Sequence, residues 1–333
     1  MFAAWLGCLA PVLAQGVPGV APVAAPPPFE QWLAELRAEA LDRGIRAEVL
    51  DRALTGIEPV EQILERDRTQ AEFTLDLEQY LKRRLTRDTL RTAQKMYSRD
   101  RALLKRVGDH YGVSPKVIVA VWGLESNFGR FAGVRPTIPA LVTLAYDPRR
   151  APMFRAELLS ALEIVNRGDI ELERLKGSWA GALGQPQFMP TSYLKYAQDF
   201  DGDGRRDIWA SHADVFASVA FYLKEHGWTT GGEWGKEIVI PATRREEALA
   251  IPRRESGCRA ERLMTAPTPL KAWRTMGFKR LRGRSLPATD VPASLVQAGS
   301  RSFLLYSNYD ALLVYNCAHS YALSVVLLAD TLK

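Results

Sequence analysis

Apolar residues recur at three- and four-residue spacing from Phe29 to about Arg106, which is the period of amphipathic helices. Trp32, Leu33 and Leu36 begin this pattern, and charged residues fill the positions between the apolar ones. The same spacing predicts four later helices, at residues 152–166, 190–199, 213–226 and 321–332. Most of the chain is therefore expected to be helical.

A different pattern occupies residues 237–303. The short apolar run 238–240 stops at a proline, and scattered prolines and glycines separate the runs that follow, which is typical of strands and turns. Farther on, the apolar runs 303–306 and 311–315 flank the polar segment 307–310, which predicts a β-hairpin. The pattern indicates an α+β fold that is predominantly α-helical and carries a small β-rich insert.

The first 28 residues resemble an export signal and a linker. Residues 2–14 are almost wholly apolar but too few to span a bilayer as a helix, which fits the apolar region of a cleaved signal peptide. No Lys or Arg precedes this run, so one feature of a signal peptide is missing. Cys8 follows Leu6 and Gly7 as in a bacterial lipoprotein cleavage site, and lipidation is the minor alternative. Residues 16–28 are an extended linker.

Composition and charge narrow the choice of partners. The 333 residues include 44 Lys and Arg and 38 Asp and Glu, a formal net charge of +6. This charge suits an anionic partner but is far below the basic density of a dedicated nucleic-acid binder. Hydrophobic residues make up 47% of the chain, which excludes wholesale disorder. Since export leads to an oxidising compartment, Cys258 and Cys317 are a candidate disulfide. The sequence equally allows two buried thiols at these positions.

The most informative segment is a helix that ends in a glutamate. Ser114 suits the N-cap and Pro115 the first turn, and the residues from there to Glu125 are apolar nearly all round, so this helix is expected to be buried. Burial and the negative end of the helix dipole both favour a protonated carboxyl at Glu125, which is what a general acid needs. The alternative is a structural ion pair with Arg130 or Arg135.

Five stretches, in order along the chain, carry a family resemblance. Residues 121–130, VWGLESNFGR, resemble the catalytic helix of lytic transglycosylases, which share a lysozyme-like core. The other stretches resemble one branch, the membrane-bound lytic transglycosylase B family (glycoside hydrolase family 103). They are residues 146–150, residues 177–193, residues 199–204, and Tyr315-Asn316 with Tyr321. The likeness runs from about Phe29 to the C-terminus.

The resemblance implies an activity and a mechanism. Members of this family cleave the β-1,4 bond between N-acetylmuramic acid and N-acetylglucosamine in peptidoglycan, and the muramic acid 6-hydroxyl replaces the second carboxylate of ordinary glycosidases. Glu125 would then be the single general acid and base, the product would carry 1,6-anhydromuramic acid ends, and no cofactor would be required. A lysozyme-type hydrolase and a non-catalytic peptidoglycan-binding protein are the alternatives.

The resemblance also implies a set of substrate-binding residues. The Gly-rich segment offers hydrogen-bonding side chains and apolar surface for sugars, and Ser178 would help position the carboxyl of Glu125. Two arginines match a family pair suited to the peptide carboxylates of the wall polymer, with solvated charges as the alternative. The tyrosines could equally be core residues. The full set is Ser178, Gln187, Phe188, Met189, Tyr222, Asn316, Tyr321, Arg149 and Arg150.

An acidic loop after the Gly-rich segment resembles an EF-hand. Asp199, Asp201 and Asp203 occupy ligand positions, and the Arg205 carbonyl would be the position-seven ligand. Position twelve is not a glutamate, and in the family the closing acid comes later, which points to Asp214. We expect a structural Ca²⁺ site, with a turn held by its own side chains as the alternative.

These expectations divide the chain into five parts: residues 1–28, a signal peptide and linker; 29–95, an N-terminal helical lobe; 96–235, the lysozyme-like core, of which 150–175 is a candidate to pack on the lobe; 236–302, the β-rich insert; and 303–333, a hairpin and helix that complete the core. The expected location is the periplasm. The expected partners are peptidoglycan glycan strands and no nucleic acid, with membrane contact only after lipidation, and the protein is expected to be a monomer.

Overall fold

The computed structural model describes residues 26–70 and 75–333, so the predicted signal peptide and Cys8 lie outside the described residues. The helices are α1 (Phe29–Asp42), α2 (Ala47–Leu54), α3 (Glu61–Gln70), α4 (Leu77–Arg84), α5 (Arg87–Arg99), α6 (Arg101–Tyr111), α7 (Pro115–Ser126), α8 (Thr137–Tyr146), α9 (Ala151–Arg167), α10 (Pro190–Tyr196), α11 (His212–Glu225), α12 (Arg245–Ala250), α13 (Leu270–Thr275), α14 (Ser307–Tyr315) and α15 (His319–Thr331). The strands are β1 (Arg135–Pro136), β2 (Lys176–Gly177), β3 (Gly235–Val239), β4 (Thr268–Pro269), β5 (Lys279–Arg280), β6 (Pro292–Ala298) and β7 (Arg301–Leu305).

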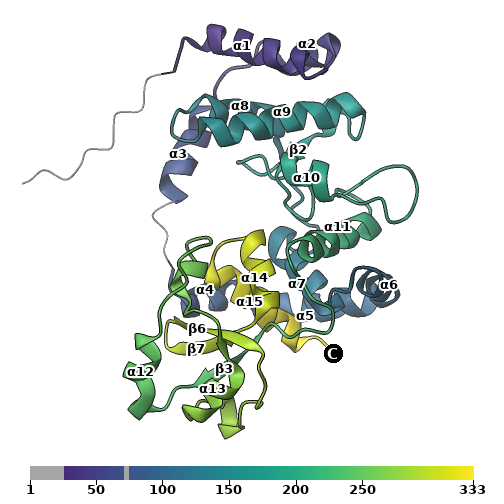
Figure 1. Cartoon of the computed structure of the whole chain (residues 1–333). Coiled ribbons are helices and arrows are strands. Elements are labelled where there is room, and N and C mark those ends of the chain that lie inside the picture. The colour runs from purple at the N-terminus through teal and green to yellow at the C-terminus, as the bar shows by residue number, and fades with distance from the viewer. Residues whose placement is uncertain (1–25, 71–74) are drawn as a thin grey trace, which may run out of the picture.

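Helix α7 lies at the centre of the helical core. Helices α5, α6, α11 and α15 pack around it, and Figure 1 shows them gathered in one body with the C-terminus. Its side chains from Val117 to Leu124 are buried on every face, as the unbroken apolar run predicted. The helix therefore projects its last residues from a rigid core.

A second helical layer lies above this core in Figure 1. Helix α8 packs on α9, α9 packs on α2 and α10, and α3 packs on α8. Trp32 of α1 meets Tyr146 edge to face at 5.5 Å, and the Tyr146 hydroxyl donates to the carbonyl of Pro27. Residues 29–95 do not form one lobe, because α4 and α5 pack on α15 and α7 of the core.

The β-rich insert is built on an antiparallel sheet with the strand order β4-β6-β7-β3-β5. Trp273, Phe278 and Leu304 belong to a small separate apolar core under this sheet. Figure 1 shows the sheet with α12 and α13 at the opposite end of the molecule from α1 and α2.

The hairpin predicted over 303–315 is wrong. Strand β7 forms its hairpin with β6 instead, and the segment that follows is helix α14. The side chain of Asn308 is fully buried and holds the start of α14 through hydrogen bonds to the Thr229 amide and the Gly232 carbonyl. A short apolar run such as 311–315 fits a buried helix as well as a strand, so its pattern alone was ambiguous.

No single described helix is long and apolar enough to cross a membrane. The pair α14 and α15 reaches the required length only when both helices are added, across a bend of 119°.

Candidate active site

Glu125 lies in the last turn of α7, and the chain turns sharply beyond it. Asn127 and Phe128 both have left-handed backbone angles, with φ of 50° and 58°. Such angles are costly for a bulky residue and persist only where packing enforces them. The Phe128 ring packs edge to face on Trp122, and a Cβ at Gly123 would come within 2.4 Å of that ring. The glycine in this motif therefore lets the chain fold back beside the carboxyl.

Burial dominates the electrostatics of Glu125. Loss of solvent raises the pKa of its carboxyl from 4.5 to about 7, and the Tyr321 hydroxyl and the Arg84 charge offset only part of that rise. The Tyr321 hydroxyl is buried and makes no hydrogen bond of ordinary geometry within the described residues, yet it favours the Glu125 carboxylate. Neither Arg130 nor Arg135 contributes to this pKa among the described residues, so the ion pair considered for them is not formed.

Helix α4 supplies two residues of this site that the sequence patterns did not single out. The Arg84 guanidinium donates to the backbone carbonyl of Leu124, next to Glu125. Tyr80, one turn earlier, interacts with Arg84, and burial raises the pKa of Tyr80. An arginine and a tyrosine four residues apart share one helix face, but nothing in the local sequence shows that this face meets the end of α7.

The Gly-rich segment 177–193 packs closely beside the end of α7. A Cβ at Gly133 would lie 2.4 Å from the Cα of Gly177, so the two backbones are in contact. The Ser178 hydroxyl accepts hydrogen bonds from the amides of Ala180 and Ala182. Ser178 therefore holds the turn of this segment, whereas the contact with Glu125 that the resemblance implied stays a prediction.

Gln185 links this segment to helix α7. Its side chain accepts from the Trp122 indole at 2.7 Å and donates to the Trp209 carbonyl at 2.7 Å. Gln187 has φ of 53° and donates to the carbonyl of Gly184. The family resemblance singled out Gln187, and no local signal in the sequence pointed to Gln185.

Aromatic rings continue the site away from Glu125. Phe188 is buried against Tyr222, with ring centroids 5.4 Å apart, and Tyr222 meets Tyr315 at 4.8 Å. Tyr315 in turn lies 6.4 Å from Tyr321 in a stacked arrangement. The predicted residues Phe188, Tyr222 and Tyr321 thus form one aromatic row with Tyr315. Met189 packs partly buried on the same core, and Asn316 is exposed just beyond Tyr315.

The predicted arginine pair lies at the start of α9. Both residues are exposed, and Arg149 forms an ion pair with the largely buried Asp147. The Arg150 guanidinium stacks on the Phe154 ring at 4.9 Å. The structure therefore fixes the direction of both side chains.

The acidic loop brings three carboxylates together. Oxygens of Asp199, Asp201 and Asp203 lie within 4.8 Å of one another, and all three residues are exposed. The amide of Arg205 donates to Asp203. The buried carboxylate of Asp214 accepts from the amides of Phe200 and Asp207, and its role as a metal ligand stays a prediction. It closes the loop through the backbone.

A cavity of about 540 Å³ lies at the other end of α7. Its lining includes Gly112, Pro115 and Trp228. Glu125 is ten residues farther along the helix, roughly 15 Å away at the rise of an α-helix. This cavity therefore does not contain the candidate acid.

With this geometry in place, comparison with known proteins decides the family. The sequence model of the family described as "Transglycosylase SLT domain" matches residues 28–330. The chain belongs to the transglycosylase SLT domain family. The family assignment made from the sequence motifs is confirmed, and so is the lysozyme-like, largely helical fold.

Individual members of the SLT domain family extend the comparison. Membrane-bound lytic murein transglycosylase B of Escherichia coli (strain K12) is 39% identical over 155 residues, which are 46% of this chain and 43% of that protein. SltB3 from Pseudomonas aeruginosa, solved in complex with NAG-anhNAM-pentapeptide, is 40% identical at a TM-score of 0.81, over 91% of this chain and 78% of that one. Escherichia coli Slt35 in complex with calcium is 27% identical at a TM-score of 0.75, over 93% and 94% of the two chains.

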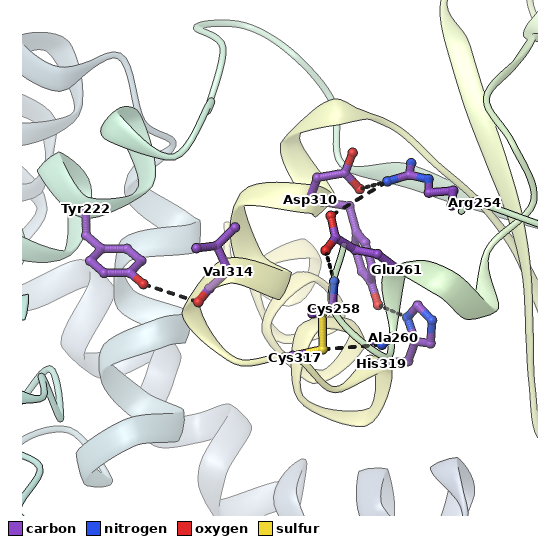
Figure 2. Close-up of a disulfide and its surroundings, with 10 residues drawn as sticks. Tyr222, Arg254, Cys258, Ala260, Glu261, Asp310, Val314, Cys317 and His319 are labelled. Carbon is purple, nitrogen blue, oxygen red and sulfur yellow. Dashed lines mark hydrogen bonds and ion pairs between the residues drawn. A yellow bond between two sulfur atoms is a disulfide. The ribbon is translucent and has the colours of Figure 1, made fainter. Parts of the chain in front are cut away.

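A disulfide between Cys258 and Cys317 joins the insert to the segment between α14 and α15. Figure 2 shows it beside Glu261, Arg254 and Asp310. In this member of the SLT domain family, the β-rich insert is thus covalently attached within two residues of Tyr315.

Proposed function

We propose that this protein is a lytic transglycosylase that cleaves the β-1,4 bond between N-acetylmuramic acid and N-acetylglucosamine in peptidoglycan. The observation that carries the proposal is the isolated carboxyl of Glu125, whose pKa burial raises to about 7. Among the described residues, no second carboxyl group contributes to that pKa. Crystal structures of one relative, SltB3, with NAG-anhNAM-pentapeptide and with NAG-NAM-pentapeptide support the same substrate class.

In the first step, the protonated Glu125 donates its proton to the glycosidic oxygen as the bond to the muramic acid anomeric carbon breaks. A pKa of about 7 keeps a large fraction of this carboxyl protonated near neutral pH. Desolvation by the core around α7 provides that state, because the charged form loses the stabilisation of water.

In the second step, the Glu125 carboxylate accepts the proton of the muramic acid 6-hydroxyl while that oxygen attacks the anomeric carbon. The Tyr321 hydroxyl and the Arg84 charge both favour the carboxylate, so they support the base form. The bond to the leaving sugar is replaced by the 1,6-anhydro bond, and Glu125 is protonated again. No water molecule is consumed.

The remaining contacts are assigned by position. Met189 and Tyr222 are half-buried and offer apolar and aromatic surface on which sugar faces pack, whereas the buried Phe188 supports Tyr222 from the core side. Gln187 and Asn316 are accessible polar side chains for acetamido and hydroxyl groups. The exposed pair Arg149 and Arg150 would bind the carboxylates of the peptide stems. The net charge of +6 also suits this anionic polymer.

Product analysis on purified sacculi tests the proposal. The wild-type protein is expected to release anhydromuramoyl products, and Glu125→Gln should fold but lose nearly all activity, since it can neither donate nor accept the proton. Glu163→Gln, which alters a carboxyl paired with Arg167 on α9, is the matched control and should remain active.

Three outcomes of that experiment would contradict the proposal. Products heavier by one water would identify a hydrolase. Binding to sacculi without any product would identify a non-catalytic peptidoglycan-binding protein. Full activity of Glu125→Gln would remove this residue from the mechanism.

We also propose that the acidic loop holds a structural Ca²⁺ and that the protein works in the periplasm as a monomer. The convergence of Asp199, Asp201 and Asp203 provides hard oxygen donors of the kind that Ca²⁺ prefers. A bound Ca²⁺ would neutralise the repulsion of these carboxylates and stabilise the loop without entering the reaction. The calcium complex of Slt35 supports the choice of ion.

A further inference from the structure

The segment between α14 and α15 is a sharp corner that carries two residues of the proposed active site. Tyr315 ends α14, and Tyr321 lies in the first turn of α15 after a bend of 119° between the two helices. Tyr321 interacts with the carboxyl of Glu125, and the Tyr315 hydroxyl donates to the carbonyl of Pro186 at 2.6 Å. The position of this corner therefore fixes how two tyrosines face the carboxyl and the Gly-rich segment.

The β-rich insert holds this corner from the outer side. Cys258 of the insert is disulfide-bonded to Cys317 in the middle of the corner, across 59 residues of sequence. The amide of Ala260 donates to the sulfur of Cys317 at 3.3 Å. Cys317 is an exposed residue, so this end of the disulfide lies near the surface.

Contacts besides the disulfide join the same elements. Arg254 of the insert forms an ion pair with Asp310 of α14 at 3.1 Å. The Tyr309 hydroxyl and His319 Nδ1 are hydrogen-bonded at 3.1 Å, which ties α14 to α15. These contacts would keep the corner folded after loss of the disulfide, although the covalent restraint at its centre would be gone.

On the side of the aromatic row, the corner is tied to helix α11. The Tyr222 hydroxyl donates to the carbonyl of Val314 at 3.2 Å, and Figure 2 shows this bond on the far side of α14 from the disulfide. The corner is thus held between the insert and the aromatic row. A movement at Cys317 would therefore displace Tyr315 and its contact with Tyr222.

We propose that Cys258 and Cys317 are positioning residues whose disulfide holds the α14–α15 corner, so that Tyr321 stays beside Glu125 and Tyr315 stays bonded to the Gly-rich segment. Thiols that reduce this bond therefore lower the rate of turnover. A dithiol supplies two electrons and two protons, becomes a cyclic disulfide itself, and leaves two protein thiols. The proposal rests on the proposed function, because it concerns the turnover of that same site.

The test compares three states of the full chain: the oxidised wild type, the wild type reduced after folding with dithiothreitol, and the double variant Cys258→Ser/Cys317→Ser. The steady-state rate on a soluble NAG-NAM-pentapeptide oligomer is measured against pH for each. Backbone hydrogen exchange over residues 316–323 provides a second readout that does not depend on activity. The matched control is Glu237→Gln, which breaks the ion pair with Arg301 in the insert sheet and leaves the corner intact.

For the reduced protein and the double variant, we expect kcat to fall about threefold or more with KM little changed, since alignment rather than binding is lost. The basic limb of the pH profile should move to higher pH, because a displaced Tyr321 no longer favours the Glu125 carboxylate. Exchange at the corner should speed up, reoxidation should restore the wild-type values, and Glu237→Gln should behave as wild type.

An unchanged kcat and an unchanged pH limb in the reduced protein would overturn the proposal, because a purely structural disulfide would lower stability alone. A thiol effect of equal size on the double variant would overturn it as well. If the oxidised wild type shows no turnover, the proposed function fails, and unchanged hydrogen exchange at residues 316–323 would then overturn the positioning role separately. Reduction after folding keeps the test valid even where the double variant does not fold.

Discussion

At the scale of single residues, the site is governed by the opposing influences on one carboxyl. Burial beneath the core favours the neutral form of Glu125, while Tyr321 and Arg84 favour the charged form. Because burial outweighs the other two and leaves the pKa at about 7, both forms are populated near neutral pH, and the same group can serve as acid and then as base. The sequence predicted the burial from the apolar run of α7, but it contained no local sign of Arg84, which comes from another helix.

The buried carboxyl should also destabilise the folded protein at alkaline pH. The folded-state pKa of Glu125 is raised from 4.5 to about 7, so the native state retains a proton that the unfolded state loses, and stability falls as pH rises between these values. At about 1.4 kcal/mol per pKa unit, the cost reaches about 3 kcal/mol above neutral pH. Glu125→Gln does not titrate and should avoid this cost.

Urea unfolding at several pH values measures this effect. The stability advantage of Glu125→Gln over wild type should be smallest near pH 4 and largest near pH 8. Glu163→Gln, at an accessible position, should show no such trend. An advantage that does not change with pH would mean that Glu125 is not held in the neutral form.

Replacement of Arg84 should shift the pH profile of activity. Arg84→Gln removes a charge that favours the Glu125 carboxylate, so the pKa of Glu125 should rise and the basic limb of kcat against pH should move upward. Loss of support for the base form should lower kcat about fivefold, the effect of about 1 kcal/mol. Arg83→Gln, the exposed neighbour on α4, is the control. A lower kcat with an unmoved basic limb would restrict Arg84 to holding the Leu124 carbonyl.

At the scale of elements, local signals predicted some features well and others poorly. Helix α7 begins at Pro115 after Ser114, as its start signals indicated, and α9 extends the predicted range 152–166 by one residue at each end. Helix α14 was mistaken for a strand because its apolar run is buried on several sides and so lacks a helical period. The start of this helix is fixed by a tertiary contact, because the buried side-chain amide of Asn308 is hydrogen-bonded to the 229–232 turn.

The division into parts failed at the same scale for a similar reason. Helices α4 and α5 continue the amphipathic pattern of α1–α3 without a break in composition, yet they pack on α15 and α7. An amphipathic face shows that a helix is packed, but it does not show on which partner. The sequence analysis therefore did not predict Tyr80 and Arg84 as site residues, because it placed their helix in the N-terminal lobe.

At the scale of the whole molecule, the site is assembled from segments far apart in sequence. Glu125 comes from α7, Arg84 from α4, Tyr222 from α11 and Tyr321 from α15. The resemblance could gather most of these residues because it carried the arrangement of a known fold. Gln185 shows what the fold adds, because one buried side chain joins α7, the Gly-rich segment and the residues after the acidic loop.

Through that connection, Ca²⁺ bound at the proposed site would stabilise the whole core. The acidic loop 199–207 leads directly to Trp209, whose carbonyl accepts from Gln185, and Gln185 in turn bonds Trp122 of α7. Ca²⁺ at 100 times its dissociation constant should stabilise the folded state by about 2.7 kcal/mol and raise Tm by several degrees. Asp201→Asn, which preserves the side-chain shape but removes one charged ligand, should weaken this response, whereas Asp109→Asn on α6 should leave it intact. Calorimetric titration measures the heat of Ca²⁺ binding, and thermal unfolding measures Tm. If Ca²⁺ produces no binding heat and no change in the Tm of the wild type, the loop is a turn held by its own hydrogen bonds.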